Sequence, residues 1–525
     1  MYVVYVSLNS SLNFDMIKHK QLILVTGATG YIGGRLVPLL LKRGYRVRAM
    51  ARSLKKLGGR TWANHPDIEL VQADLLDSST LETGLKNCHA AYYLVHSMNP
   101  DHQDFVNADR LAALNFIKAA EKAQLGRIIY LGGLGWDQPN ASAHLKSRHE
   151  VGDILASGNI AVTRFRAAQI LGSGSACFEM ARYILERIPI FIIPRHIIDT
   201  KIQPISIRNV LTYLAECLEK AETLNQSYEI GGPDILTYRQ LFQICAEEKG
   251  LKSPVFINTP KLELGEMLGL GLVKWILPLP KYISEPLLDG MVVQVIQKDF
   301  RINTLIPHEL IPIRESVRRA IKADAFYEAE SRWTDAGELR SPEWLVAGDA
   351  PYSGGTLLKS GYRILVSKQP DSIWTAIRRI GGEQGWYYGN AIWRIRGWFD
   401  RLLGGTGLWP ERRHPEELRI GDVLGFWRVL DIRVPSRLVL LSEKKQPGEN
   451  ILILELKSEK SGSEITVSNW FCPSRPYGFL YWFLLQPFRN NLFRGMLKAI
   501  ARKTCSQIIL QPKKLTNLDF KNIEM

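Results

Sequence analysis

The feature that most constrains this chain is a glycine-rich turn near its start, in the stretch LILVTGATGYIGGRL at residues 22–36. A short run that suits a buried strand leads into Gly27, Gly30 and Gly33, and a helical pattern follows. Glycines at this spacing let the backbone approach a pyrophosphate, and the helix start offers unpaired N–H groups and the positive end of its dipole. The stretch therefore predicts a dinucleotide site between a strand and a helix.

The pattern around this turn predicts an α/β fold, because runs that suit buried strands alternate with helical patterns. We expect strands at 22–26, 46–50, 68–72, 90–95, 127–132, 160–165 and 227–233, and helices at 31–43, 79–87, 103–123 and 144–157. Such alternation is typical of a doubly wound parallel sheet with helices on both faces.

A change in composition marks a second domain. From residue 351 onward there are 27 Lys and Arg against 15 Asp and Glu, so this part carries +12 (27 − 15) of the net charge of +15. The predicted divisions are an extension at 1–19, a first domain at 20–325, an irregular acidic linker at 326–350, a second domain at 351–512 and a tail at 513–525. The excess of basic residues favours binding to an anionic membrane surface or to an acidic protein partner. Alternatively, these residues form a solvated face without a partner.

Within the second domain the pattern changes from alternation to mostly strands. We expect a strand at 356–367, a helix at 371–380, strands at 386–396, 423–432, 436–444, 450–457 and 463–471, and a terminal helix at 477–503. This order predicts an α+β domain in which a sheet wraps around a long helix. Pro487 is expected to kink or restart that helix.

Several classes of protein are disfavoured. The apolar runs 268–280 and 476–488 are too short to span a bilayer, and the first 15 residues lack the basic start and cleavage site of a secretory signal. The six cysteines include no Cys-x-x-Cys pair, so we expect no metal site and a reducing, cytoplasmic location. A protein that lies in the cytoplasm and binds peripherally to a membrane is also compatible with the sequence. The net positive charge is the only feature that favours DNA binding. Because the sequence shows no helix-turn-helix, no nucleic-acid partner is expected.

The second strand ends at Arg52, where many dinucleotide sites place an acidic residue against the ribose hydroxyls. Because arginine suits a 2′-phosphate, the sequence favours NADP over NAD, which is still possible. Asp74 follows the third strand and is expected beside the adenine, although it could equally cap a helix. The predicted cofactor-binding residues are Thr26, Gly27, Thr29, Gly30, Tyr31, Ile32, Gly33, Arg52, Asp74 and Leu75.

The stretches TGATGYIGG, VRAMAR, QADLLD and RIIYLGGLG resemble the atypical short-chain dehydrogenases/reductases, which include the NmrA-like proteins and the Rossmann accessory subunit of respiratory complex I. The resemblance covers about residues 20–325 and implies a Rossmann fold and an NAD(P) cofactor. It is specific for fold and cofactor and weak for substrate.

The resemblance also implies a catalytic site, from which this chain departs. Catalytic members carry a serine after the fifth strand and a Tyr-x-x-x-Lys pair on the next helix. Here His144 takes the tyrosine position and Arg148 the lysine position, while the segment 131–135 reads LGGLG without a serine. His144 is a candidate acid or else a surface residue, and His96, after the fourth strand, is the second candidate.

The second domain resembles an uncharacterised bacterial domain related to the START-like helix-grip superfamily, through segments 412–432 and 476–502. Helix-grip folds enclose an apolar cavity, which implies a hydrophobic small-molecule ligand. A stripe on the terminal helix either lines that cavity or closes the sheet: Leu492, Phe493, Met496, Leu497 and Ile500. Arg412, Arg413 and His414 could bind an anionic head group or be loop charges.

Two functions therefore stay open from the sequence. The first is an NADP-dependent oxidoreductase acting on a hydrophobic carbonyl or quinone-like substrate. The second is a non-catalytic NADP(H)-binding sensor or complex-assembly factor, which the missing serine and tyrosine favour.

Overall fold

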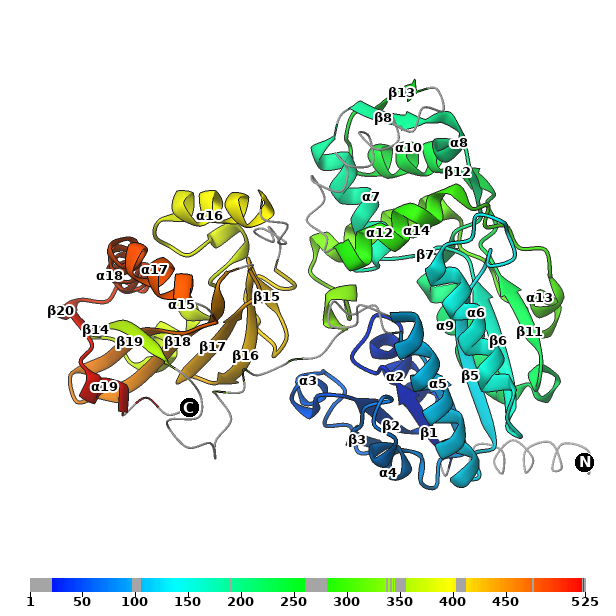
Figure 1. The fold of residues 1–525 in the computed structure, drawn as a ribbon, viewed down its shortest axis with the longest axis horizontal. Coiled ribbons are helices and arrows are strands. Elements are labelled where there is room, and N and C mark those ends of the chain that lie inside the picture. Colours follow the sequence, from blue (N-terminus) through cyan, green and yellow to red (C-terminus); the bar gives the residue numbers. More distant parts are fainter. Residues whose placement is uncertain are drawn as a thin grey trace, which may run out of the picture. The chain divides into compact units, whose positions relative to one another are not determined.

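The computed structural model describes residues 21–96, 105–188, 190–259, 281–336, 339, 342, 344, 356–402, 412–444, 446–474, 476–521 and 523. The chain divides into two compact units, Met1–Glu338 and Leu339–Met525 (Figure 1). The predicted extension 1–19 and the apolar run 268–280 lie outside the described residues. Among the helices within the described ranges, none is long and apolar enough to cross a membrane.

A seven-stranded parallel sheet forms the centre of the first unit, in the order β11-β6-β5-β4-β1-β2-β3. Its strands are β1 (Leu22–Thr26), β2 (Arg46–Ala51), β3 (Ile68–Gln72), β4 (Ala90–Tyr93), β5 (Arg127–Gly133), β6 (Ala161–Ala167) and β11 (Ser227–Ile230). All seven expected strands are confirmed, with ends that differ by a few residues. The strand order reverses between β1 and β4, and ligands of such sheets bind at the carboxyl ends of the strands beside this point.

Helices cover both faces of this sheet because its strands alternate their side chains between two cores. Ile23 and Val25 pack on the face covered by α2 (Gly33–Lys42) and α9 (Ile207–Glu216). Leu22 and Leu24 pack on the other face, which is covered by α4 (Leu81–Leu85), α5 (Phe105–Lys122) and α6 (Ala143–Ala156). The predicted doubly wound α/β fold is confirmed.

Shorter elements extend the first unit beyond the sheet. The helices are α3 (Leu54–Gly58), α7 (Ala176–Arg187), α8 (Arg195–Ile198), α10 (Tyr238–Glu248), α12 (Lys281–Asp289), α13 (Arg301–Leu305) and α14 (Ile313–Ala325). Three two-stranded sheets pair β7 (Ile170–Leu171) with β10 (Ile205–Ser206), β9 (Lys201–Ile202) with β12 (Leu236–Thr237), and β8 (Ile190–Pro194) with β13 (Val255–Thr259). No sequence pattern predicted these pairs.

Residues 331–336, which the sequence assigned to the linker, pack on the first unit beside the glycine turn. The Ser331 hydroxyl donates to the Tyr31 carbonyl oxygen over 2.7 Å, and the Arg35 guanidinium donates to the Ser331 carbonyl oxygen over 3.0 Å. Asp335 forms an ion pair of 3.1 Å with Arg60. Residues 331–336 therefore belong to the first unit rather than to a free linker.

A seven-stranded antiparallel sheet forms the second unit, in the order β15-β16-β17-β18-β19-β14-β20. The strands are β14 (Leu358–Val366), β15 (Val423–Leu424), β16 (Trp427–Arg433), β17 (Arg437–Ser442), β18 (Gly448–Glu459), β19 (Gly462–Pro473) and β20 (Ile508–Lys514). The helices α15 (Pro370–Ile377) and α18 (Gln486–Lys503) pack on it. This arrangement is the expected α+β domain, and its relation to the helix-grip superfamily stays a prediction.

Two predictions for the second unit were wrong. Residues 386–396 were expected to form a strand, but α16 (Asn390–Leu402) begins there, because Trp393, Gly397 and Asp400 form one buried helical face. The tail 513–525 contributes to the fold, since β20 extends the sheet to residue 514 and Phe520 on α19 (Asn517–Lys521) is buried. Spacing of aromatic residues alone did not separate strand from helix at 386–396.

The terminal helix divides as its proline predicts. The helix α17 (Pro476–Leu484) ends before Leu485, and α18 restarts with Pro487 in its first turn, where no backbone N–H is needed. All five residues of the predicted stripe on α18 are buried in the core of the second unit, so the stripe closes the sheet.

The arginines proposed for a head group have internal partners. Arg412 donates to the Ile380 and Glu417 carbonyl oxygens, and Arg413 pairs with Asp422 at 3.1 Å. Both side chains are therefore buried, and they hold the loop 412–422 and join it to the segment after α15.

Candidate functional site

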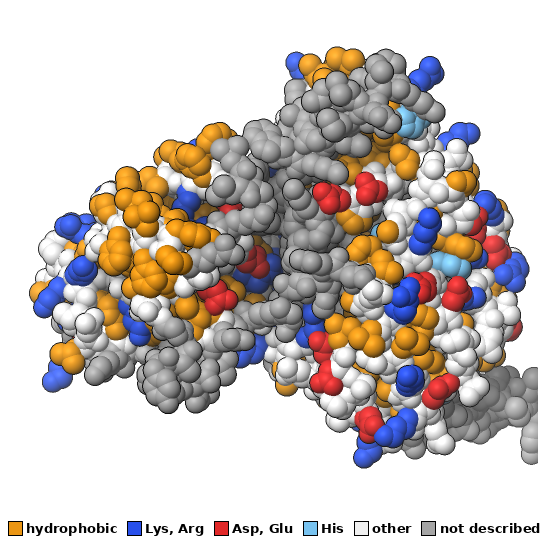
Figure 2. Space-filling view, viewed as in Figure 1, with side chains coloured by type: hydrophobic (Ala, Val, Ile, Leu, Met, Phe, Trp, Pro, Cys, Tyr) orange, Lys and Arg blue, Asp and Glu red, His pale blue; other side chains and the backbone are white. Residues whose placement is uncertain are grey.

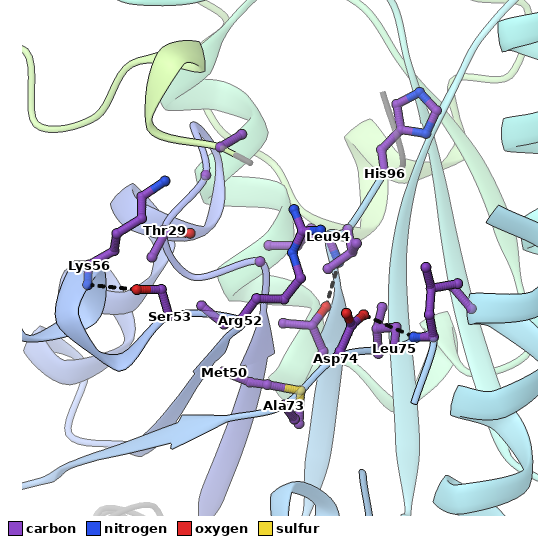
Figure 3. Close-up of a pocket in the computed structure, with 18 residues that line it drawn as sticks. Thr29, Met50, Arg52, Ser53, Lys56, Ala73, Asp74, Leu75, Leu94 and His96 are labelled. Atoms are coloured by element: carbon purple, nitrogen blue, oxygen red, sulfur yellow. Dashed lines mark hydrogen bonds between the residues drawn. The ribbon is translucent and has the colours of Figure 1, made fainter. Parts of the chain in front are cut away.

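A pocket lies at the carboxyl ends of β1, β2, β3 and β4, where the strand order reverses (Figure 3). We call it the glycine-loop pocket. Eight of the predicted site residues line it: Thr26, Gly27, Thr29, Gly30, Arg52, Asp74, Leu75 and His96. Figure 3 shows Lys56 and Ser53 on one side of it and His96 on the other. The structure therefore brings these eight residues together at one pocket, and their roles in binding a cofactor stay a prediction.

The glycines are required by the backbone of this loop. Gly27 has a φ of +63°, a conformation that other residues rarely adopt. A Cβ atom on Gly33 would overlap the Gly27 carbonyl oxygen, so Gly33 shapes the turn from its buried place and does not line the pocket. The turn itself, at Gly27, Thr29 and Gly30, forms part of the pocket wall and leads into α2. These features fit a pyrophosphate.

Charged side chains complete the glycine-loop pocket. Arg52 follows β2 and Asp74 follows β3, so the two lie on neighbouring strand ends. One Asp74 oxygen accepts from the Leu76 backbone N–H over 3.0 Å, so the residue does cap its turn. Lys56 also lines this pocket and donates to the Asp335 carbonyl oxygen over 2.6 Å, whereas Arg48 pairs with Glu69 at 2.6 Å and does not line it.

A second, larger pocket adjoins the first and is mainly apolar. This apolar cavity has a volume of about 390 Å³ and shares Leu94 and His96 with the glycine-loop pocket. Its walls come from β5, α6, α7, α10 and the segment 286–295. Tyr31 and Ile32, predicted as cofactor residues, line this cavity, as do His144 and Arg148. Of the predicted catalytic residues, His96 therefore lines both pockets, and His144 and Arg148 line the apolar cavity.

Several polar side chains line the apolar cavity, and Gln169 is one of them. The Gln169 amide donates to the Tyr238 hydroxyl over 3.2 Å, while its Oε1 atom is buried without a hydrogen-bond partner among the described residues. Burial of an unpaired acceptor is unfavourable by about 1–3 kcal/mol. Gln169 Oε1 is therefore positioned to accept a hydrogen bond from a ligand.

A chain of three side chains runs from the protein interior to the apolar cavity. Asp109 on α5 is buried and its Oδ2 atom lies 2.7 Å from His96 Nδ1. The other nitrogen of that ring, Nε2, lies 2.8 Å from His144 Nδ1. The Ser147 hydroxyl donates to the same Asp109 oxygen over 3.1 Å. The chain ends at His144, which lines the cavity.

Burial and charge oppose each other at this pair of histidines. Burial lowers the pKa of His96, against the hydrogen bond and charge of Asp109, which raise it. Burial, His96 and Arg148 lower the pKa of His144 well below 6.5. The pair is therefore neutral at pH 7, and Asp109 is the group that favours its protonated form.

The remaining part of the expected catalytic site is absent, as the sequence indicated. The segment 131–134 at the end of β5 lines the apolar cavity without a hydroxyl group. Arg148 donates to the Leu131 carbonyl oxygen, and its own carbonyl oxygen accepts from the Tyr130 hydroxyl over 2.7 Å. Arg148 thus joins α6 to β5 at the place where a lysine would lower the pKa of a tyrosine.

Sequence reasoning missed Asp109. The apolar face of α5 is otherwise formed by residues such as Ala112, Ala113 and Phe116, and Asp109 falls on this face. A single carboxylate on an apolar helical face was the available signal, because buried charges need a partner. That partner, His96, is on another element and could not be identified from spacing.

Comparison with known proteins agrees with this geometry. A family model described as NAD(P)H-binding matches residues 27–171, and a model described as a protein of unknown function (DUF2867) matches residues 352–496. Cinnamoyl-CoA reductase 1 of Petunia hybrida is 29% identical over 123 residues, which cover 22% of this chain and 36% of the reductase. The chain therefore spans about a third of that relative.

Two further relatives match more of the chain. Divinyl chlorophyllide a 8-vinyl-reductase of Zea mays is 26% identical over 265 residues, which cover 45% of this chain and 61% of the reductase. Photosystem II assembly factor Ycf39 of Trieres chinensis is 23% identical over 235 residues, which cover 44% of this chain and 70% of the factor. The first unit of this chain therefore contains an NAD(P)H-binding domain with a Rossmann-type parallel sheet, and it is similar over part of its length to these relatives.

Proposed function

We propose that this protein is an NADP(H)-dependent reductase that acts on a hydrophobic carbonyl or quinone-like substrate in the apolar cavity. The observation that carries the proposal is the hydrogen-bonded row Asp109–His96–His144, in which His96 lines both pockets and His144 lines the apolar cavity. A reductase needs a proton donor beside its substrate, and these three side chains supply one in place of the missing tyrosine.

The hydrogen bonds determine how the histidine pair works. Ionised Asp109 requires a proton on His96 Nδ1, so neutral His96 accepts from the Nδ1–H of His144. When the pair gains one proton, every tautomer that keeps these hydrogen bonds has a proton on His144 Nε2. That nitrogen is the donor to the substrate, while His96 and Asp109 position the ring and share the charge.

The proposed reaction transfers one hydride and one proton to the substrate. When bound, the reduced nicotinamide supplies a hydride to the electrophilic carbon of the substrate. His144 donates its Nε2 proton to the substrate atom that gains negative charge, and the pair returns to its neutral form. The products are the reduced substrate and the oxidised cofactor, and the next proton comes from water.

Arg52 supports NADP(H) over NAD(H) within this proposal. It lines the glycine-loop pocket at the end of β2, where an acidic side chain would instead accept from ribose hydroxyls. A guanidinium binds a 2′-phosphate through charge-assisted hydrogen bonds. The apolar lining of the second pocket supports the hydrophobic substrate, and Gln169 supports one hydrogen-bond donor group on it.

The proposal is tested by following NADPH oxidation with apolar aldehydes, enones and quinones, for the wild type and His144→Gln. Loss of a general acid lowers kcat by about 10²- to 10⁴-fold, while the Kd for NADPH is unchanged. The matched control is His149→Gln, because His149 lies on the same helix and pairs with Asp153 at 3.2 Å without lining either pocket. Turnover that survives His144→Gln would remove His144 from the mechanism.

The alternative is a non-catalytic NADP(H)-binding sensor or assembly factor. The missing serine and tyrosine favour it, and Ycf39, which matches a similar share of the chain, is named as an assembly factor. A wild-type protein that binds NADPH tightly but oxidises it with none of the three substrate classes would support this alternative and overturn the reductase.

A further inference from the structure

The helices α16 and α17 of the second unit expose an unusual number of large apolar side chains. On α16, the exposed fractions are 57% for Ile395, 51% for Trp398 and 54% for Phe399. The segment 476–488, which holds α17 and the start of α18, exposes six more: Tyr477, Phe479, Leu480, Phe483, Leu484 and Phe488. We call these nine side chains the α16–α17 face. Extended exposed apolar patches mark interaction sites.

The two helices are joined, so their exposed side chains belong to one surface. Arg396 of α16 donates to the Tyr481 hydroxyl of α17, and its guanidinium lies 6.0 Å from the Tyr481 ring centre. Figure 2 shows hydrophobic side chains gathered over the region where Figure 1 places α16, α17 and α18, with Lys and Arg side chains at the edge. The face is therefore not a set of scattered residues.

The exposed charges on the helices that form this face have one sign. The segment 476–503 contains five Lys and Arg and neither Asp nor Glu. The segment 390–402 contains three arginines and a single acid, Asp400, which is buried. Arg494 and Arg502 are exposed on α18. An occupant of this face must therefore be apolar where it meets the aromatic side chains and negatively charged around them.

We propose that the α16–α17 face binds the surface of an anionic phospholipid bilayer. Phe, Leu and Trp side chains of an interfacial helix enter the boundary between head groups and acyl chains, while basic side chains contact anionic lipid head groups. The tyrosine and tryptophan of the face suit that boundary, because each has an apolar ring and a polar N–H or O–H group. This inference is independent of the proposed reductase activity.

The test is sedimentation of the full chain with vesicles of phosphatidylcholine, alone or mixed with phosphatidylglycerol. We expect binding to the anionic vesicles that weakens at high salt, since about 1 M salt screens charges beyond roughly 3 Å. The double variant Leu480→Gln/Leu484→Gln should weaken binding about 10- to 100-fold, because two exposed leucines no longer enter the bilayer. Both side chains are exposed, at 61% and 63%, so folding is unaffected.

The matched control is Leu510→Gln/Leu518→Gln. These leucines are also exposed, at 61% and 73%, lie in the same unit and are outside the face. Equal loss of binding in both double variants, or no sedimentation of the wild type with anionic vesicles, would overturn the proposal. If the wild type ignores vesicles but forms a dimer in light scattering that Leu480→Gln/Leu484→Gln dissociates, the face is an interface between two copies of the chain instead.

Discussion

Replacing Asp109 by Asn tests the histidine chain without a substrate. The amide has nearly the same shape, and its oxygen can still accept from His96 Nδ1, which lies 2.7 Å from the carboxylate oxygen now. The variant removes the charge that raises the pKa of His96 against burial. A hydrogen bond to a charged group stabilises by about 1.5–3 kcal/mol, and each 1.36 kcal/mol changes a protonation equilibrium tenfold. The protonated fraction of the pair at pH 7 should therefore fall about 10- to 150-fold.

The assay is NMR of the full chain labelled at the imidazole carbons, with His96 and His144 assigned by substitution. In the wild type, both rings should titrate below pH 6.5, and Asp109→Asn should move their midpoints to lower pH. Asp153→Asn is the matched control, because Asp153 contacts His149 at 3.2 Å on the same helix, outside both pockets. Midpoints that stay in place in Asp109→Asn, or that move equally in the control, would refute the reasoning.

Three further predictions concern the cofactor, the turn and the substrate. Arg52→Ala should weaken NADPH binding about 10- to 150-fold and leave NADH binding unchanged in calorimetry, while Arg46→Ala, at the start of β2 and outside the glycine-loop pocket, should change neither. Gly33→Ala should lower the free energy of unfolding in urea by about 1–3 kcal/mol and abolish NADPH binding, whereas Gly58→Ala, with open space around its Cβ, should be neutral or stabilising. Gln169→Leu should raise KM for the substrate about tenfold with little change in kcat, because the hydrogen bond that it removes stabilises the bound substrate and the transition state equally.

The sequence predicted the sheet of the first unit because two local signals agree there. Runs such as LILVT are short, apolar and bounded by turns, and the glycine loop fixes where the first strand ends. The same signals indicated eight of the residues that line the glycine-loop pocket, since the carboxyl ends of parallel strands meet at one edge. They could not separate Tyr31 and Ile32 from the cofactor residues, because neighbouring residues in the turn line different pockets.

Long-range contacts explain what the sequence did not show. Asp335 was assigned to a linker because its partner Arg60 lies 275 residues earlier in the chain. Likewise, Asp109 meets His96 only because α5 packs beside the end of β4. Within the second unit, residues 386–396 were expected to form a strand. The structure has a helix there, with Trp393, Gly397 and Asp400 on its buried face.

The buried carboxylate bears directly on the choice between an enzyme and a sensor. Relatives that match similar shares of the chain are named as a reductase and as an assembly factor, so similarity does not decide it. A helix face built from alanines and phenylalanine would pack without Asp109, and burial of its charge is unfavourable unless a partner offsets it. The partner is one ring of a histidine pair that burial keeps neutral at pH 7, and Asp109 opposes that effect. A site that only holds a cofactor gains nothing from easier protonation of two imidazoles, whereas a proton donor depends on it. The reaction should therefore be faster in mildly acidic solution than at neutral pH, and it should lose this dependence together with Asp109.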